Sequence, residues 1–573
     1  MFSITASSRS VVFITTCAKW RKSNPILSAS LSLSLVLGFL LACSVFGLAD
    51  DNIHCHAVSA HEPTAAETAY LAGDAAKAES LYREALNKTP HDPELISGLV
   101  RALLREQKVD EASTIIHSGL TSALNSAVLL TALGEVQYRQ GKVFEAASTA
   151  DQIYRADPCV PRLHLLRARI FRLNSMYASE RREIGFAHAL DPWDQGIRSV
   201  WIGTLPLTQR VEEQKKFLDS SNGLDEEERK RAEHVLAYLE NRIDNPGKTC
   251  HLVSSATSTQ IPMVPVMNGV RFMGAWGLDV SFNNKTARLD IDTGASGLFI
   301  SRAVAERAGL KPVEHVNVGG VGDQGMAGAY TAYADSIRVG SLEFHDCLVE
   351  VSDRKDVVNM DGLIGADVFS NYLVTLDYPG RKLSLSPLPP NPSERETATS
   401  LNTSTADPSA GSNTSATSSP AGPPDRYISP SMKDYFPIFR SGHMLLMPTV
   451  LNHKVQRLFL LDTGAFASSI SPEAAREVTK VRGGAPIRIQ GLNGEVAKVS
   501  TSDKIIFQFG GIEQDNSDVI SFDTTHLSRS AGLEVSGFLG DTVLRQLTIH
   551  IDYRDGLIKF DYDPRHNTSG FTY

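Results

Sequence analysis

The sequence predicts a multidomain chain in which an all-α helical repeat precedes two all-β domains of one design. Three observations carry this prediction. Residues 63–196 are rich in Ala, Leu, Glu and Arg and repeat with a period of 34. From about residue 262, short runs of Val, Ile, Leu and Phe alternate with Gly- and Asn-containing turns, which indicates β-structure, and this texture occurs twice. A stretch dominated by Ser, Thr, Pro, Ala and Gly separates the two occurrences.

Composition is typical of ordinary folded domains. The chain has 573 residues, of which 42% are hydrophobic and 21% charged, and its formal net charge is −9. There is no basic stripe and no interleaving of aromatic with basic residues, so nucleic acid is not expected as a partner.

Residues 1–49 are expected to be a signal peptide or a membrane or lipid anchor. Four basic residues precede a charge-free apolar stretch over residues 26–48. Residues 40–43, Leu-Leu-Ala-Cys, resemble a bacterial lipoprotein cleavage box, in which Cys43 would be lipidated. Residues 47–49, Gly-Leu-Ala, offer a simple cleavage site instead. Cleavage, lipidation and retention all place the rest of the chain outside the cytoplasm, in the periplasm or attached to the membrane through this segment only.

Four cysteines follow the leader region, at Cys55, Cys159, Cys250 and Cys347. An even number in an exported protein permits disulfides, but the sequence leaves their pairing open. No Cys-x-x-Cys occurs, and the sequence suggests neither a metal nor a cofactor.

The helical repeat is expected over residues 63–243. Ala78, Ala112 and Ala146 follow one another at the period of the repeat, and a proline recurs in the same register. A small residue lets two helices approach closely, and proline ends a helix because it lacks an N–H. The segment resembles tetratricopeptide repeats in about four copies. That resemblance implies a surface for a peptide or partner protein; a packing module without its own ligand is the alternative.

The two β-rich units span residues 262–388 and 436–564. Residues 389–435 between them are too poor in apolar side chains to bury a core, so they are expected to be a disordered linker. A tether of about 45 residues reaches roughly 35–40 Å, which lets the units dock within one chain. Pairing in cis is expected to compete well with pairing between chains, although the sequence leaves both open.

The units repeat three features in one order. The first is Asp-Thr-Gly after an apolar strand, at residues 292–294 and 462–464. The second is a glycine-rich segment, at residues 319–325 in the first unit and 491–494 in the second. The third is a hydrophobic pair flanked by glycines, at residues 362–365 and 537–540. One Asp-Thr-Gly occurs readily by chance, whereas three features repeated at near-equal spacing are specific.

Over about 250 of its 573 residues the chain therefore resembles retropepsin-like aspartic proteases, especially their bacterial tandem members. The resemblance implies an aspartic endopeptidase with one catalytic aspartate from each unit, Asp292 and Asp462, and a peptide or protein substrate. It implies that Thr293, Gly294, Thr463 and Gly464 support the catalytic loops, with each threonine hydroxyl bonding across to the other unit. It also implies a flap that contains Gly320, Gly322, Gly491, Asn493 and Gly494.

Amide hydrolysis by this route needs two carboxylates around one water. Two like charges at close range do not both ionise easily, so the pair shares a proton. The ionised member takes a proton from the water, and the protonated member assists the carbonyl oxygen and the leaving nitrogen.

Two positions remain open. Asp290 lies on the same strand side as Asp292 and is interpreted as an exposed or paired carboxylate rather than a third catalytic acid. Phe466 stands where Ser296 stands in the first unit, and its ring either fills a subsite or disturbs the hydrogen bonds around Asp462. The alternative function is therefore a non-catalytic cell-envelope scaffold that binds proteins through degenerate protease domains.

Overall fold

The computed structural model describes residues 4–6, 55–59, 62–220, 224, 226–268, 272–323, 327–353, 361–392, 423–484 and 487–566. The predicted leader, including Cys43, lies outside the described residues apart from β1 (Ile4–Ala6), which pairs antiparallel with β24 (Ile512–Asn516). In the described part of the chain no helix is both long enough and apolar enough to cross a bilayer.

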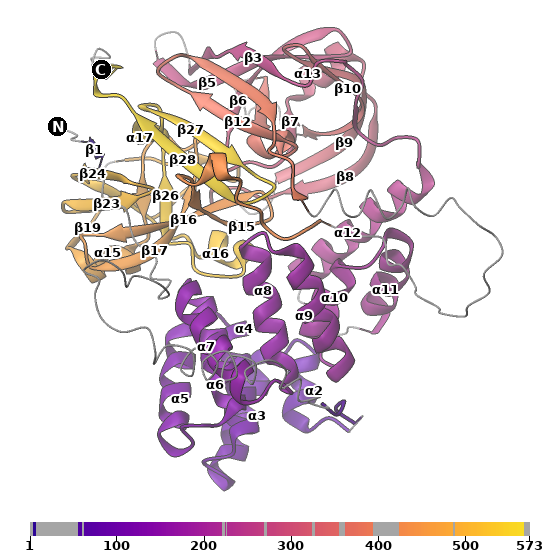
Figure 1. Cartoon of the computed structure of the whole chain (residues 1–573). Coiled ribbons are helices and arrows are strands. Elements are labelled where there is room, and N and C mark those ends of the chain that lie inside the picture. The colour runs from indigo at the N-terminus through magenta and orange to yellow at the C-terminus, as the bar shows by residue number, and fades with distance from the viewer. Residues whose placement is uncertain are drawn as a thin grey trace, which may run out of the picture.

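The predicted order of an all-α repeat followed by two β-rich units is confirmed (Figure 1). The helices are α2 (Ala65–Leu71), α3 (Ala75–Lys88), α4 (Pro93–Arg105), α5 (Val109–Ser122), α6 (Ala127–Arg139), α7 (Val143–Ala156), α8 (Pro161–Leu173), α9 (Tyr177–Leu190), α10 (Gln195–Gly203), α11 (Leu207–Ser220) and α12 (Glu226–Asp244). The three alanines that define the period are fully buried. Small side chains at these points let neighbouring helices approach closely.

The tight turns inside the hairpins share a backbone conformation. Gly73, Gln107, Gly141 and Ser175 occupy the same position of successive repeats, and each has a positive φ, between 56° and 82°. Glycine adopts this conformation without steric cost, whereas Gln and Ser do so at some expense. Two structural features therefore recur with the period of the sequence: a turn residue with positive φ, and a close contact between helices.

The two units repeat one arrangement of strands. The first contains β2 (His251–Leu252), β3 (Thr259–Pro262), β4 (Val264–Asn268), β5 (Phe272–Phe282), β6 (Lys285–Asp292), β7 (Leu298–Ile300), α13 (Arg302–Ala308), β8 (Pro312–Val318), β9 (Ala327–Val339), β10 (Leu342–Ser352), β11 (Gly362–Gly365), β12 (Tyr372–Asp377) and β13 (Lys382–Pro387). The second contains β14 (Phe436–Pro437), β15 (Phe439–Ser441), β16 (Met444–Leu451), β17 (Val455–Leu461), β18 (Ser469–Ile470), α15 (Pro472–Val478), β19 (Val481–Gly483), β20 (Gln490–Gly491), β21 (Gly494–Glu495), β22 (Ser500–Ser502), β23 (Ile505–Phe509), β24, β25 (Val519–Ser521), α16 (Thr525–Ala531), β26 (Gly537–Leu539), α17 (Asp541–Leu544), β27 (Leu547–Asp552) and β28 (Leu557–Tyr562). In each unit the strand before the Asp-Thr-Gly pairs in parallel with the strand of the later glycine-flanked pair, β6 with β11 and β17 with β26.

A shared six-stranded sheet joins the units, in the order β14-β28-β27-β12-β13-β3. Its central pair, β12 with β27, runs antiparallel and places Val374 opposite Ile551. Both side chains are fully buried in a hydrophobic core that extends through the two units. The units are therefore held together by backbone pairing and a common core, which the sequence could not show.

The helical array packs directly against the second unit. Ile153 and Leu163 of the array belong to one buried cluster with Leu458, Leu533 and Val535 of the second unit. The cluster buries apolar area on both sides, so it stabilises the junction through the hydrophobic effect.

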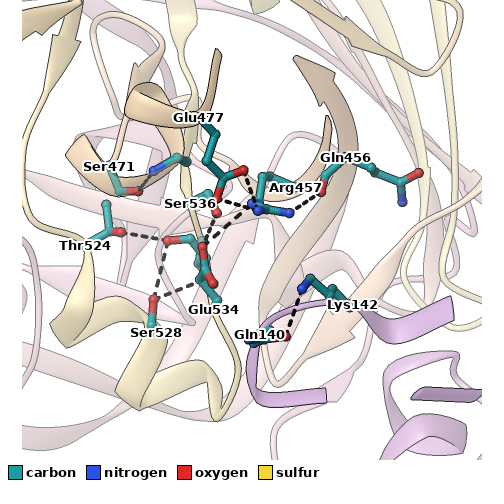
Figure 2. A network of polar contacts seen from close by, with 12 residues as sticks. Gln140, Lys142, Gln456, Arg457, Ser471, Glu477, Thr524, Ser528, Glu534 and Ser536 are labelled. Carbon is teal, nitrogen blue, oxygen red and sulfur yellow. Dashed lines mark hydrogen bonds and ion pairs between the residues drawn. The ribbon is translucent and has the colours of Figure 1, made fainter. Parts of the chain in front are cut away.

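Backbone contacts fix the position of the junction. The Glu534 amide donates to the Arg139 carbonyl at 2.9 Å, and a Cβ added at Gly141 would lie 2.9 Å from the Glu534 carbonyl oxygen. Figure 2 shows Glu534 beside Ser536 and Arg457, close to the α6–α7 turn. Burial raises the pKa of Glu534, whereas Ser536 and Arg457 lower it.

The prediction of a disordered linker over residues 389–435 is wrong at both ends. At the first end Asn391 is buried, and Arg554 donates to the Pro389 carbonyl at 2.7 Å. Residues 423–435 are described, and Asp425 accepts hydrogen bonds from the backbone N–H and the hydroxyl of Ser179 at 2.9 and 2.7 Å. The Arg426 side chain donates to the Asp555 carbonyl at 2.7 Å. Composition suggested disorder, but these two charged side chains find partners on the array and on the second unit. Residues 393–422 of the predicted linker lie outside the described residues.

Two disulfides resolve the pairing that the sequence left open. Cys55 bonds to Cys159, which ties the segment before the array to the end of its third hairpin. Cys250 bonds to Cys347 and ties the segment after α12 to β10 of the first unit. Each closes a loop of about a hundred residues, for which loss of unfolded-chain entropy favours the folded state by roughly 4–5 kcal/mol.

Candidate active site

The two aspartates follow buried strands that occupy equivalent places in their units. Asp292 is the last residue of β6, opposite Gly365 of the parallel strand β11. Asp462 follows β17, and its amide donates to the Leu539 carbonyl of the parallel strand β26 at 3.0 Å. The residues before them, Ile291 and Leu461, are buried, so the apolar run predicted to anchor each aspartate does so.

Thr293 and Thr463 join the two loops by four reciprocal hydrogen bonds. Each backbone N–H donates to the hydroxyl oxygen of the other threonine at 3.0 Å. The Thr293 hydroxyl donates to the Leu461 carbonyl at 2.7 Å, and the Thr463 hydroxyl donates to the Ile291 carbonyl at 2.8 Å. Both threonines are almost completely buried. Because each hydroxyl both donates and accepts across the interface, neither loop can shift without breaking bonds on both sides.

The glycines of the two triplets make room for the opposite carboxylate. A Cβ added at Gly294 would lie 2.8 Å from Cγ of Asp462, and one added at Gly464 would lie 2.6 Å from Cγ of Asp292. Both distances are shorter than carbon contacts allow. The two carboxyl groups therefore meet across the axis that relates the units, and any side chain in place of either glycine would displace one of them.

Backbone amides hold each carboxylate from its own loop. Asp292 Oδ1 accepts from the N–H groups of Gly294 and Ala295 at 2.7 and 3.1 Å. Asp462 Oδ1 accepts from Gly464 and Ala465, both at 2.9 Å. The near-identical geometry shows that Phe466 does not disturb the bonds around Asp462. Its ring is instead 53% exposed beside the loop.

The electrostatics of the pair are asymmetric. Burial raises the pKa of Asp292, although the amides of Gly294 and Ala295 and a hydrogen bond with Asp462 oppose that rise. Burial also raises the pKa of Asp462 well above its usual range, and the charge on Asp292 raises it further. Burial and mutual repulsion therefore favour a single proton shared by the two carboxyls.

Asp290 differs from the expectation of an exposed or paired carboxylate. Its side chain is only 4% exposed, and its Oδ1 has no hydrogen-bond partner among the described residues. Burial and then the charge on Asp292 raise its pKa well above the ordinary value. The equivalent position in the second unit is the buried Leu460. Burial beside the dyad therefore favours the neutral form of Asp290.

Replacing Asp290 with Asn should stabilise the protein at neutral pH. A carboxyl with a raised pKa in the folded state contributes stability that is complete below its unfolded value of 3.8 and is lost as pH rises toward the folded pKa. We expect the free energy of unfolding of Asp290→Asn to exceed the parent's by about 1–3 kcal/mol near pH 7.5, and this difference to shrink near pH 4. Thermal denaturation at both pH values measures it. The exposed Asp335→Asn is the control, and an equal gain in both variants would contradict the interpretation.

The five predicted flap residues come together where two hairpin tips meet. Gly320 and Gly322 follow β8 in the first unit, and Gly491, Asn493 and Gly494 belong to the β20–β21 hairpin of the second. The Asn493 amide donates to the Val321 carbonyl at 2.9 Å, and its side-chain Nδ2 donates to the Gly320 carbonyl at 3.2 Å.

Close backbone approach explains the glycines at the tips. Gly322 has φ of 131°, and a Cβ there would lie 2.3 Å from the Asn493 carbonyl carbon. A Cβ at Gly491 would lie 2.2 Å from the Val321 carbonyl oxygen. Only glycine permits this contact on either side.

The hairpin tips exchange apolar side chains. Val321 of the first unit packs against the buried cluster of the second, which includes Val496 and Phe538. Leu492 of the second unit packs against the cluster of the first, which includes Phe299 and Val316. This reciprocal exchange holds the hairpins in contact in the described state.

Asp367 is a loop-holding residue to which sequence reasoning assigned no role. Its carboxylate accepts from the Ser296 hydroxyl at 3.1 Å and from the Gly297 amide at 2.9 Å. It lies two residues after the repeated glycine-flanked pair in the first unit, so its place after that motif was the available signal. In the second unit the Ser468 hydroxyl accepts from the Gly540 amide at 3.1 Å and plays the corresponding part.

Comparisons with known proteins match two parts of the chain. The aspartyl protease family model matches residues 278–368, which include Asp292. The tetratricopeptide repeat model matches residues 69–129. Among solved structures, a thermophilic tetratricopeptide repeat protein from Thermus thermophilus is 23% identical, with 30% of this chain and 95% of that chain covered and a TM-score of 0.25. Comparison with curated proteins gave no match. The chain thus contains tetratricopeptide repeats and, after them, an aspartyl protease domain.

Proposed function

We propose that the chain is an aspartic endopeptidase whose single active site is formed by Asp292 and Asp462, one from each unit. The observation that carries the proposal is the reciprocal seating of the two carboxylates against Gly294 and Gly464 of the opposite loops. Degenerate domains would have no need to keep both glycines, both threonines and the amide bonds to both aspartates. The arrangement therefore supports an enzyme over the non-catalytic scaffold.

In the proposed mechanism Asp292 is the ionised member of the dyad and Asp462 the protonated one. Asp292 is ionised and takes a proton from a water bound between the carboxyls, and the water oxygen attacks the scissile carbonyl carbon. Asp462 is protonated and donates to the carbonyl oxygen, which becomes a hydroxyl of the tetrahedral intermediate. When the C–N bond breaks, the proton held by Asp292 passes to the leaving nitrogen and Asp462 regains its proton from the intermediate's hydroxyl.

The meeting hairpins would act as the flap of this enzyme. Substrate entry would require the tips at Val321 and Leu492 to leave their opposite clusters, and closure would exclude bulk water from the dyad. The exposed ring of Phe466 beside the second loop supplies an apolar wall for a substrate side chain.

The pH dependence of peptide cleavage tests the proposal. Activity requires one proton on the pair, so kcat/KM should be bell-shaped with pH. Because burial raises both pKa values, the acidic limb should lie above 3.8, the ordinary aspartate value. The assay is cleavage of a mixed peptide library by the full chain across about pH 3 to 8, with mass-spectrometric readout and pepstatin as the inhibitor. Absence of cleavage across this range, or cleavage indifferent to pepstatin, would overturn the assignment.

We also propose that the protein works outside the cytoplasm. The two disulfides support this location, because cystines persist in oxidising compartments and are rare in the cytosol. Alkylation of Cys55 and Cys159 in unreduced protein from the source cell would contradict it.

A further inference from the structure

Five arginines of the array and one of the second unit carry neighbouring positive charges. They are Arg139 on α6, Arg169 and Arg172 on α8, Arg210 on α11, Arg242 on α12 and Arg529 on α16; we call them the arginine surface. Figure 1 shows α8 beside α16, where the array meets the second unit. Arg172, Arg242 and Arg529 are exposed, and the other three are half-buried, so the surface reaches solvent.

These cations lie close enough to influence one another. Burial lowers the pKa of Arg139, and the charges of Arg169 and Arg529 lower it further. Burial likewise lowers the pKa of Arg210, with further lowering from Arg172 and Arg242. Folding thus brings these like charges close together, and their repulsion lowers the stability of the folded protein.

Among the described residues, most of this charge has no ion-pair partner. Arg172 pairs with Glu180 at 2.9 Å, but the other five form no ion pair within the described part of the chain. Arg139 donates only to neutral acceptors, Gln107 Oε1 at 2.6 Å and the Gly532 carbonyl at 3.2 Å. The buried Nε atoms of Arg139 and Arg210 have no partner among the described residues.

Two other arginines of α8 are compensated. Arg162, also on α8, pairs with Glu135 at 2.8 Å and with Asp194 at 2.5 Å. Arg167 pairs with Asp151 at 2.7 Å and with Glu183 at 3.1 Å. Helix α8 thus carries both compensated arginines and, at Arg169, an arginine without an ion pair among the described residues.

We propose that the arginine surface binds an acidic segment of a protein substrate and thereby delivers that substrate to the protease units. The inference rests on the proposed function. Guanidinium groups bind carboxylates in two-point geometry, and a row of Asp or Glu side chains on an extended segment can reach several of them at once. The net charge of −9 disfavours a nucleic acid as the ligand. Because Arg529 belongs to the second unit, a segment bound to the arginine surface would lie next to that unit.

A binding experiment tests this independently of catalysis. The full chain carrying Asp292→Asn is titrated into a fluorescein-labelled twelve-residue peptide rich in Asp and Glu, and into the matched Asn and Gln peptide, at low and moderate salt. We expect the acidic peptide to bind at least about tenfold more tightly at low salt, with the advantage falling as salt rises. Arg169→Glu and Arg529→Glu should each abolish most of that advantage. Arg169→Gln should weaken it less, and Lys77→Glu, an equal charge change on the exposed surface of α3, should leave it intact.

Equal binding of both peptides would overturn the proposal, and so would tighter binding of a single-stranded oligonucleotide than of the acidic peptide. The variants' melting temperatures must match the parent's; if Arg169→Glu fails to fold, Arg169→Gln and Arg529→Glu decide the result.

A kinetic experiment connects the surface to cleavage. A substrate with an acidic tail outside its scissile sequence should have a lower KM than its neutral-tailed counterpart, with kcat unchanged, and Arg529→Glu should remove that difference. Cleavage of short peptides should be the same in parent and variant. If acidic peptide binds but no peptide is cleaved by the parent, the proposed protease function fails while the binding site stands. If peptides are cleaved but the charge of the tail changes neither KM nor binding, the proposed role of the arginine surface is wrong and the protease function stands.

Discussion

Asp292→Asn should lower kcat/KM for peptide cleavage at least about 10³-fold while leaving the fold intact. The amide keeps the shape of the carboxylate and can still accept from the Gly294 and Ala295 amides, but it cannot take a proton from the attacking water. Asp462→Asn should be equally inactive, because its side chain cannot supply a proton to the carbonyl oxygen. Steady-state cleavage of one fluorogenic peptide, with circular dichroism and melting temperature as checks on folding, measures both effects.

The exposed Asp335→Asn is the matched control and should retain full activity. Mixing the two inactive variants tests how the units pair. In this structure the dyad is completed within one chain through the Thr293–Thr463 bonds and the β12–β27 pairing, so the mixture should stay inactive. Recovery of activity on mixing would show that the working site forms between chains.

Thr463→Val should have the largest effect on stability of any single change at the site. Valine keeps the volume but removes the hydroxyl that accepts from the Thr293 amide at 3.0 Å and donates to the Ile291 carbonyl at 2.8 Å. Both groups are left without a partner in a buried interface, each at about 1–3 kcal/mol. We therefore expect the free energy of unfolding to fall by roughly 2–5 kcal/mol in chemical denaturation, and cleavage to fall with it because the loops no longer hold the carboxyls in place.

Thr286→Val is the control for this change, since Thr286 is exposed on β6, the strand that carries Asp292. Its stability should match the parent's within about 0.5 kcal/mol. Adding Thr293→Val to Thr463→Val should cost less than the first substitution, because the four bonds form one network. Strictly additive losses of stability, or a Thr463→Val protein as stable as the parent, would contradict the stabilising role of the Thr293–Thr463 hydrogen-bond network.

Local sequence patterns were enough to predict much of the fold. The constant spacing of Ala78, Ala112 and Ala146 predicted the helical hairpins, because a helix contact and a tight turn recur at fixed intervals. The repeated Asp-Thr-Gly predicted two related β-units, since each apolar strand must end in a turn that carries the aspartate. The resemblance to retropepsin-like proteases implied which glycines would belong to a flap.

Other features depend on partners that lie far away in the sequence. Asp290 was expected to be exposed or paired, because strand alternation shows which face of a strand a residue lies on but not what surrounds it. In the structure its Oδ1 is buried and has no hydrogen-bond partner among the described residues. The ordered last part of the linker depends on Asp425 finding Ser179, 246 residues away. The two disulfide pairings were open for the same reason.

The sequence by itself determined the order of the domains and the residues proposed to carry the chemistry, because strand, turn and helix-contact preferences are local. Only the tertiary structure decided that Gly294 lies against Asp462, that the hairpin tips exchange Val321 and Leu492, and that Arg139 of the array lies near Arg529 of the second unit. These contacts arise from the shared sheet and the packing of the array on the second unit, and the free energy of such packing belongs to pairs of distant segments rather than to either segment alone.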